Sequence, residues 1–264
     1  QMAGISLSGA ISSWALADQG LALAASLMAL CVLLILLVPL FIREHPGERL
    51  LPWSTGVERP QGPRAGSKTW QAIVIGLYRA IVLPMSLLLI LIEACNRITS
   101  GILIGLAPMV TIQELGWTQI TYANWIAITG VTAAVLGVLC SPWIDRVGAL
   151  RILKWVVMFR IGLLGLTATL EPYWGIHQVF ESFLMINAVA TQLVTVTLIA
   201  LFMRLCSPRV AASQFAVYMA LANMTYSLGS GLMVPLSHWT HQAGIMLVCA
   251  ALIALMWLLI HWVD

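Results

Sequence analysis

An acidic and a basic residue lie four positions apart in an otherwise apolar segment, IEACNRITSG. The spacing of Glu93 and Arg97 places them on one face of a helix, with Asn96 beside them. An ionisable group near the middle of a bilayer costs about 2.5–3.5 kcal/mol to insert, so we expect these three residues to line a polar cavity for a solute or a proton. The alternative is a pair that merely neutralises itself within one helix.

Two further ionisable residues have no partner nearby in the sequence. Arg160 lies near the middle of the apolar run 149–169, and Glu181 lies near the start of the run 178–204, with Asn187 further along. A carboxyl group inside a membrane can carry a proton across it, so Glu93 or Glu181 is the expected proton carrier. Glu181 could instead stabilise the start of its helix.

The run 212–236 adds uncharged polar groups. Asn223 and Tyr226 are secondary candidates for substrate contact, the alternative being weak hydrogen bonds between helices. Small residues also recur in this run, and they favour close helix packing over a flexible gate. They are Ala212, Ala216, Ala220, Gly229 and Gly231.

The composition of the whole chain indicates the class of protein in which these residues lie. Of its 264 residues, 61% are hydrophobic and only 9% are charged, whereas a soluble domain has about 25% charged residues. This hydrophobicity also excludes intrinsic disorder, which needs few apolar residues. The net charge of +3 is too small for a protein that binds nucleic acid. We therefore expect an all-α, polytopic membrane protein with the lipid bilayer as its surroundings.

Apolar runs of suitable length predict about eight membrane-spanning helices, since a helix needs about 20 residues to cross the hydrocarbon core. The first run is short and rich in Gly, Ser and Ala. The predicted spans are 3–16, 21–42, 82–110, 121–143, 149–169, 178–204, 212–236 and 243–262.

Basic residues alternate between successive connections, which predicts orientation. Lys and Arg gather in 43–70, 144–154 and 204–211 and are missing from 17–20, 111–120, 170–177 and 237–242. The basic side, including the long polar segment 43–70, is therefore expected to be cytoplasmic. A short interfacial helix is predicted over 69–81.

Several kinds of site lack a sequence signature. The five cysteines show no CxxC spacing, and His238 and His241 have no third ligand nearby, so no metal site is predicted. HExxH, GxSxG and Walker A motifs do not occur. We therefore expect neither an enzyme nor a cofactor, and favour secondary transport.

The segment SPWIDRVGALR (141–151) resembles the cytoplasmic loop of the major facilitator superfamily, roughly GxLxDRxGR[KR]. Asp145, Arg146, Gly148 and Arg151 match, while Ser141 replaces the first glycine. The resemblance implies a gating loop in which Asp145 pairs with basic groups of a neighbouring helix in one conformation.

Within that superfamily the chain is similar to the AmpG-like branch of muropeptide permeases and acetyl-CoA transporter relatives. REHPGERLLPW (43–53), FES (180–182) and LFMRLCSPRVAASQFAVYMAL (201–221) support this similarity. It implies a partial major facilitator superfamily fold in three parts, with most of the N-terminal bundle outside this chain. The three parts are the last helices of the N-terminal bundle (1–42), a central cytoplasmic loop with an interfacial helix (43–81), and a six-helix C-terminal bundle (82–264).

The resemblance also implies a function. The expected protein is a proton-coupled importer of a small polar solute such as an anhydro-muropeptide, located in the bacterial inner membrane and working by alternating access. Its partners would be the solute, protons and the N-terminal bundle. A siderophore importer of the same superfamily is an alternative, and so is a non-transporting half-bundle that senses a ligand or acts as a scaffold.

Overall fold

The computed structural model describes residues 21–41, 75, 78, 81–207 and 211–263, and in these the chain is all-helical, without strands. In chain order the elements are α2 (Leu21–Phe41), α4 (Pro84–Pro108), the π-helical η1 (Met109–Glu114), α5 (Gln119–Val147), α6 (Ala149–Thr169), the 3₁₀ turn η2 (Glu171–Tyr173), α7 (His177–Leu205), α8 (Ala211–Trp239) and α9 (Gln242–Ile260).

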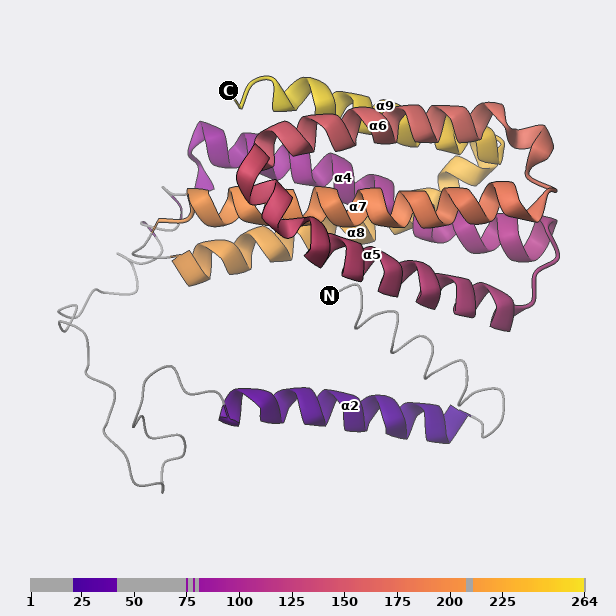
Figure 1. The fold of residues 1–264 in the computed structure, drawn as a ribbon, viewed down its shortest axis with the longest axis horizontal. Helices are drawn as coiled ribbons and strands as arrows, with labels where there is room; N and C mark the ends of the chain where they lie inside the picture. The colour runs from indigo at the N-terminus through magenta and orange to yellow at the C-terminus, as the bar shows by residue number, and fades with distance from the viewer. Residues whose placement is uncertain (1–20, 42–74, 76–77, 79–80, 208–210, 264) are drawn as a thin grey trace.

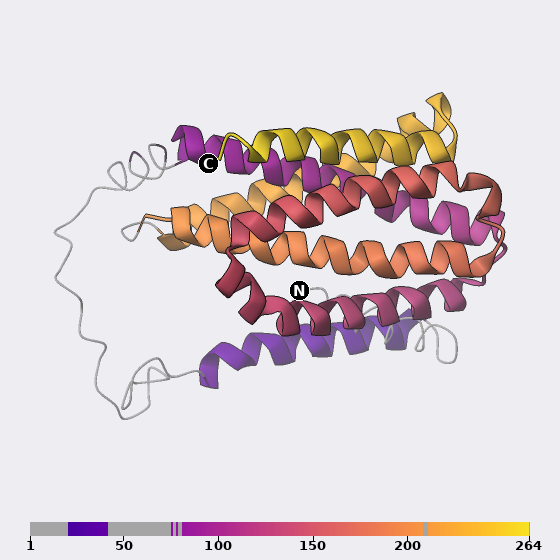
Figure 2. The same cartoon turned by 45° about the horizontal axis from the view of Figure 1, so that its top comes forward.

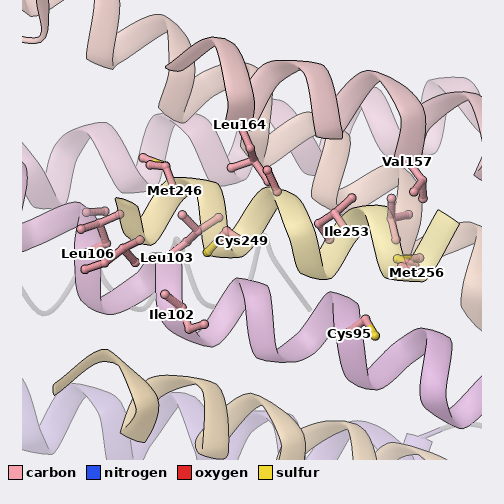
Figure 3. Packing of buried hydrophobic residues seen from close by; sticks show 14 of the residues in the cluster. Cys95, Ile102, Leu103, Leu106, Val157, Leu164, Met246, Cys249, Ile253 and Met256 are labelled. Atoms are coloured by element: carbon pink, nitrogen blue, oxygen red, sulfur yellow. The ribbon is translucent and has the colours of Figure 1, made fainter. Parts of the chain in front are cut away.

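Helices α4 to α9 lie side by side in one bundle, and each runs opposite to its predecessor (Figures 1 and 2). Helix α4 packs most extensively on α8, α6 on α9, and α5 on α7, while α4 also contacts α9. Figure 3 shows α9 with Cys249, Ile253 and Met256 directed at the neighbouring helices, which supply Leu103 from α4 and Leu164 from α6. Helix α2 lies apart from the bundle in the view of Figure 1 and exposes most of its described large apolar side chains.

Two glycines bring the backbones of α4 and α8 together. A Cβ atom on Gly101 would meet the carbonyl oxygen of Tyr226 and would lie 2.7 Å from the amide nitrogen of Ser230. A Cβ on Gly229 would lie 2.8 Å from the Cα of Ile98. Helices in a bilayer associate by such close packing, because lipid supplies little hydrophobic drive for helix pairing.

The small residues of α8 therefore divide between two surfaces. Gly229 makes the close helix packing predicted from the sequence, whereas Gly231 has open space around it. The alanines are exposed on the outside of the bundle: Ala212, Ala216 and Ala220. The expected packing is thus confirmed at Gly229, and the alanine stripe takes no part in the bundle core.

The helix ends follow from local chemistry. Pro84 begins α4 at a position where a missing N–H costs nothing. The hydroxyl of Thr118 accepts a 3.1 Å hydrogen bond from the Thr121 amide and so caps α5. Gly148, with φ of 100°, is the single residue between α5 and α6, and this backbone conformation favours glycine.

Predicted and observed helices agree closely in the C-terminal part of the chain. The run 149–169 coincides with α6, and the runs 178–204, 212–236 and 243–262 each match a helix within about three residues. Two expected boundaries are wrong because helical hydrogen bonding continues past them. The span 82–110 continues as a π-helix to Glu114, and 121–143 continues to Val147, so the connection predicted over 144–154 is helical apart from Gly148.

The predicted first span 3–16 and the polar segment 43–70 lie outside the described residues. Of the interfacial helix predicted over 69–81, the structure describes Ile75, Tyr78 and Ile81, and these are helical. An extended Leu83, with ψ of 134°, then separates them from α4.

Among the described residues, four helical segments are long and apolar enough to cross a membrane: Pro84–Glu114, Gln119–Val147, His177–Leu205 and Gln242–Ile260. The other two helices of the bundle are more polar. Helix α6 contains Arg151, Lys154 and Arg160, and α8 has polar residues along its length. The fold is therefore a helical bundle with segments whose length and composition suit a membrane span.

The antiparallel order sorts charge to the two ends of the bundle. Arg146, Arg151 and Arg204 lie at the end where α5, α7 and α9 finish. Glu114 and Glu171 lie at the opposite end, where a hydrogen bond from Gln242 to Glu114 connects the start of α9 to η1.

Candidate functional site

A buried polar cluster joins three helices in the interior of the bundle. Within α4, the Nε of Arg97 donates a 2.5 Å charged hydrogen bond to Oε1 of Glu93, as the four-residue spacing predicts. Asn96 donates a longer hydrogen bond, 3.4 Å, to the other carboxylate oxygen. Glu93 is 3% exposed and Asn96 is 1% exposed, so both are withdrawn from the surface of the bundle.

Arg160 extends this cluster to α6 and α7. Its Nη1 donates a 2.7 Å hydrogen bond to Oδ1 of Asn96, and its Nε donates one of 3.2 Å to Oδ1 of Asn187. Arg160 is fully buried, and its Nη2 has no hydrogen-bond partner among the described residues. We call these five residues the arginine–glutamate cluster: Glu93, Asn96, Arg97, Arg160 and Asn187.

The cluster lies near the middle of the bundle. At 1.5 Å per residue, Glu93 is about 14 Å from the start of α4 and Arg160 about 17 Å from the start of α6. Both helices start at the same end, and half of a 30 Å hydrocarbon core is about 15 Å. A buried arginine at that depth is stabilised only by the polar groups that other helices bring to it.

The other predicted site residues lie outside the hydrogen bonds of this cluster. Glu181 is partly exposed on α7, with no hydrogen bond or ion pair among the described residues. It also does not cap α7, whose N-cap is Ile176 and which begins four residues before it. Asn223 is exposed on α8. Tyr226 is half-buried and lies within electrostatic range of Arg97.

The predicted gating residues gather at the junction of α5 and α6. Asp145, Arg146 and Arg151 are exposed, and within the described chain none of the three forms an ion pair. Gly148 makes the turn itself. Asp145 is thus accessible to a basic group that comes from outside this bundle, as a latch requires.

A second buried network was not predicted from the sequence, and it lies between the arginine–glutamate cluster and the basic end of the bundle. Tyr218 on α8 donates a 3.0 Å hydrogen bond to the hydroxyl of Ser86 on α4 and accepts one of 2.6 Å from the side-chain amide of Gln214. Gln214 in turn accepts a 2.9 Å hydrogen bond from the backbone amide of Ser207.

The side chains of this network are almost completely enclosed. Ser86 and Gln214 are fully buried and Tyr218 is 1% exposed. The Tyr218 ring also packs on Phe202 of α7, with the ring centroids 4.7 Å apart. We call Ser86, Gln214 and Tyr218 the tyrosine network. Uncharged residues of these types are common in helix cores, which is why their pattern in the sequence does not distinguish them.

The chemistry available at this site is proton and anion binding. In the described part of the chain, no three His, Cys, Asp or Glu side chains come together as metal ligands. Comparison with known proteins adds no family to this picture, because no protein-family model, curated protein or solved structure matches the chain.

Proposed function

We propose that this chain is part of a proton-coupled secondary transporter of the major facilitator superfamily, in the AmpG-like branch, which imports a small polar solute such as an anhydro-muropeptide. The arginine–glutamate cluster is the observation that supports this proposal most directly. The carboxyl group of Glu93 and the guanidinium group of Arg160 are buried at mid-depth, where ionisable groups are costly to insert and often mark a substrate or proton pathway. The five residues of the cluster come from three helices, which suits a site that changes as helices move.

The charge balance of the cluster favours an anionic group on the solute. Arg97 is paired with Glu93, whereas Arg160 contacts only neutral amides and retains an unpartnered Nη2. With Glu93 ionised the cluster has one net positive charge, and protonation of Glu93 raises it to two. Carboxylate groups, such as those of a muropeptide, are bound well by a guanidinium group.

The outer face of α8 supports a second bundle beside this one. Ala212, Ala216, Ala220, Asn223 and Ser227 are all exposed and repeat at three- or four-residue intervals, so they share one face of the helix. Small and polar residues on a membrane helix favour contact with another helix over contact with lipid. In the proposed transporter, the N-terminal bundle covers this face, and the two bundles rock about a site near the bilayer midplane.

The proposal includes the count of eight spans, a location in the bacterial inner membrane and a cytoplasmic segment 43–70. The sorting of basic residues to one end of the bundle supports this orientation, because cytoplasmic connections have an excess of Lys and Arg. Asp145 and Arg146 then lie on the cytoplasmic side, as a gating loop requires.

The test is uptake by the complete gene product in right-side-out and inverted vesicles. Radiolabelled anhydro-muropeptide, a ferric siderophore and a sugar are compared with and without a proton gradient. Proton-driven accumulation of the muropeptide, abolished by a protonophore, is the expected result. Accumulation of the siderophore alone moves the assignment to that class of solute, and no accumulation under any gradient favours a sensor or scaffold.

A further inference from the structure

An apolar groove lies on the bundle between α5, α6 and α7. Helix α7 runs between the other two, and both pack on it more extensively than on each other (Figures 1 and 2). The groove has a volume of about 530 Å³, within the range of about 300–1,000 Å³ that is typical of sites for one small molecule. Every residue that lines it is apolar or aromatic, and Trp155 and Phe159 of α6 are each more than half exposed. The groove is therefore open to whatever surrounds the bundle.

A basic side chain continues the α6 wall of this groove toward the basic end of the bundle. Arg151, Trp155 and Phe159 follow one another at intervals of four residues, so they lie along one face of α6. Arg151 is exposed in the first turn of the helix, about 6 Å along the axis from Trp155. That turn contains no acidic residue, and the start of a helix presents unpaired N–H groups and the positive end of the helix dipole. This end of the groove thus attracts an anion.

Two tryptophans lie between the basic end and the depth of the groove. Trp143 on α5 and Trp155 on α6 are each about half exposed, with ring centroids 6.5 Å apart. They lie about 6 Å from the end of α5 and about 9 Å from the start of α6, whereas the lining residue Leu136 is about 17 Å from the end of α5. Tryptophan is enriched at the level of lipid headgroups. The order from the end inward is charge, tryptophan and apolar groove, which is also the order of phosphate, glycerol and acyl chain in a phospholipid.

We propose that this groove binds one acyl chain of an anionic phospholipid from the surrounding membrane, and that Arg151 binds the phosphate of its headgroup. The inference rests on the proposed function only for the orientation in the membrane, which places the basic end at the cytoplasmic leaflet. That leaflet has a negative surface potential, and basic pockets between membrane helices on that side bind anionic headgroups. Neither the solute nor the proton is part of the argument.

The charges at this end favour an anionic headgroup over a zwitterionic one. Arg146 and Arg204 are exposed there together with Arg151, and Asp145 is the one acidic residue that the described chain places at this end. A guanidinium group binds phosphate with two parallel hydrogen bonds. A zwitterionic headgroup would add a cation to a region that already has an excess of positive charge.

The groove is separate from the face of α8 that the proposed second bundle covers. Its lining comes from α5, α6 and α7, and α8 contributes no residue to it. A bound chain would contact both α6 and α7, the helices that the hydrogen bond between Arg160 and Asn187 joins. Binding to the folded protein alone raises its stability, so occupation of the groove is measurable as a higher melting temperature.

The first experiment tests the headgroup, with the complete gene product in detergent micelles. Dioleoyl phosphatidylglycerol and dioleoyl phosphatidylcholine, which have the same chains, are titrated separately while the melting temperature is recorded. Phosphatidylglycerol should bind about fivefold more tightly, and Arg151→Gln should remove this preference. Arg204→Gln is the matched control: it removes a charge at the same end, but about 16 Å along α7 from the lining residue Leu193, and should change the affinity less than about twofold.

The second experiment locates the acyl chain. Phosphatidylglycerol with brominated chains, added at about one lipid per protein, quenches the fluorescence of tryptophans that it contacts. Quenching should fall in Trp155→Phe and persist in Trp239→Phe, which changes an exposed tryptophan at the opposite end. Val189→Trp fills the groove from α7 and should weaken binding of phosphatidylglycerol at least about tenfold, whereas Val248→Trp, on an exposed position of α9, should not.

The outcomes separate this site from the proposed function. Equal affinity for the two lipids, or equal effects of Arg151→Gln and Arg204→Gln, would overturn the headgroup assignment. Wild-type binding by a folded Val189→Trp protein, or unchanged quenching in Trp155→Phe, would overturn the groove, and so would a dimer that Val189→Trp dissociates in the absence of any lipid effect. If Val189→Trp does not fold, Trp155→Phe still decides. No measurement uses transport, so failure of uptake contradicts the proposed function and not this site.

Discussion

Arg160 and Asn96 are 64 positions apart in the chain, and a 2.7 Å hydrogen bond joins Nη1 of the arginine to Oδ1 of the asparagine. This contact connects α6 to α4 across the centre of the bundle. It is the point at which a fully buried cation meets the paired charges of α4, so changes at either residue affect both stability and the proposed transport.

Asn96→Leu should lower the free energy of unfolding by about 1.5–3 kcal/mol, because it removes an acceptor from a buried guanidinium group. Combined with Arg160→Met, which removes the cation, it should recover most of that stability. Thermal unfolding in detergent, followed by intrinsic fluorescence, measures the stability of the single and of the double variant. A double variant no more stable than Asn96→Leu would show that the hydrogen bond is not what stabilises Arg160.

Glu93→Gln should reduce proton-driven uptake by at least about tenfold while Glu181→Gln leaves it unchanged. Glu93 is buried in the arginine–glutamate cluster, whereas Glu181 is partly exposed and outside it. Uptake in vesicles at a fixed proton gradient compares the two, each with the other as control. The reverse order of effects would make Glu181 the proton carrier.

Gly229→Ala should destabilise the bundle by about 1–3 kcal/mol, because the new methyl group overlaps the backbone of Ile98 and pushes α4 from α8. Gly231→Ala, two residues away with open space around it, should be neutral or slightly stabilising because alanine favours helix. The difference in melting temperature between the two variants is the measurement. Equal melting temperatures would mean that the two backbones separate at no cost.

Gly148→Ala should cost about 1–2 kcal/mol, because the residue at the α5–α6 turn has φ of 100°. Gly162→Ala, inside α6 with open space around it, is the control and should not destabilise. Chemical unfolding in detergent compares the two. A stable Gly148→Ala protein would show that this turn adopts another backbone conformation at little cost.

Sequence periodicity predicts the helices well where apolar runs end in turns. Glu93 and Arg97 are also predictable, because their contact depends only on helical spacing. The extension of α4 into η1 was missed, since a π-helix after Pro108 has no apolar signature of its own. The bond between Asn96 and Arg160 depends on the arrangement of the whole bundle, which brings two residues 64 positions apart within reach of each other and which no local pattern contains.

The tyrosine network shows the same limit more clearly. Tyr218, Ser86 and Gln214 are neutral, so the insertion cost that draws attention to Glu93 does not draw attention to them. Ser86 and Tyr218 are 132 positions apart in the chain, so their contact depends on how two distant helices pack together. Gln214 is one of the uncharged polar groups of the run 212–236, for which hydrogen bonds between helices are the alternative expectation.

The position of Arg160 in the chain has a consequence for biogenesis. In the proposed topology of eight spans, synthesis delivers α4 before α6, so the oxygen of Asn96 that binds Nη1 enters the membrane ahead of the arginine, while Asn187 follows on α7. An arginine at the centre of an isolated helix costs about 2.5–3.5 kcal/mol to integrate. The order of the helices therefore lets α6 leave the translocation machinery against an acceptor that is already in place, and α7 completes the coordination of the cation when it arrives.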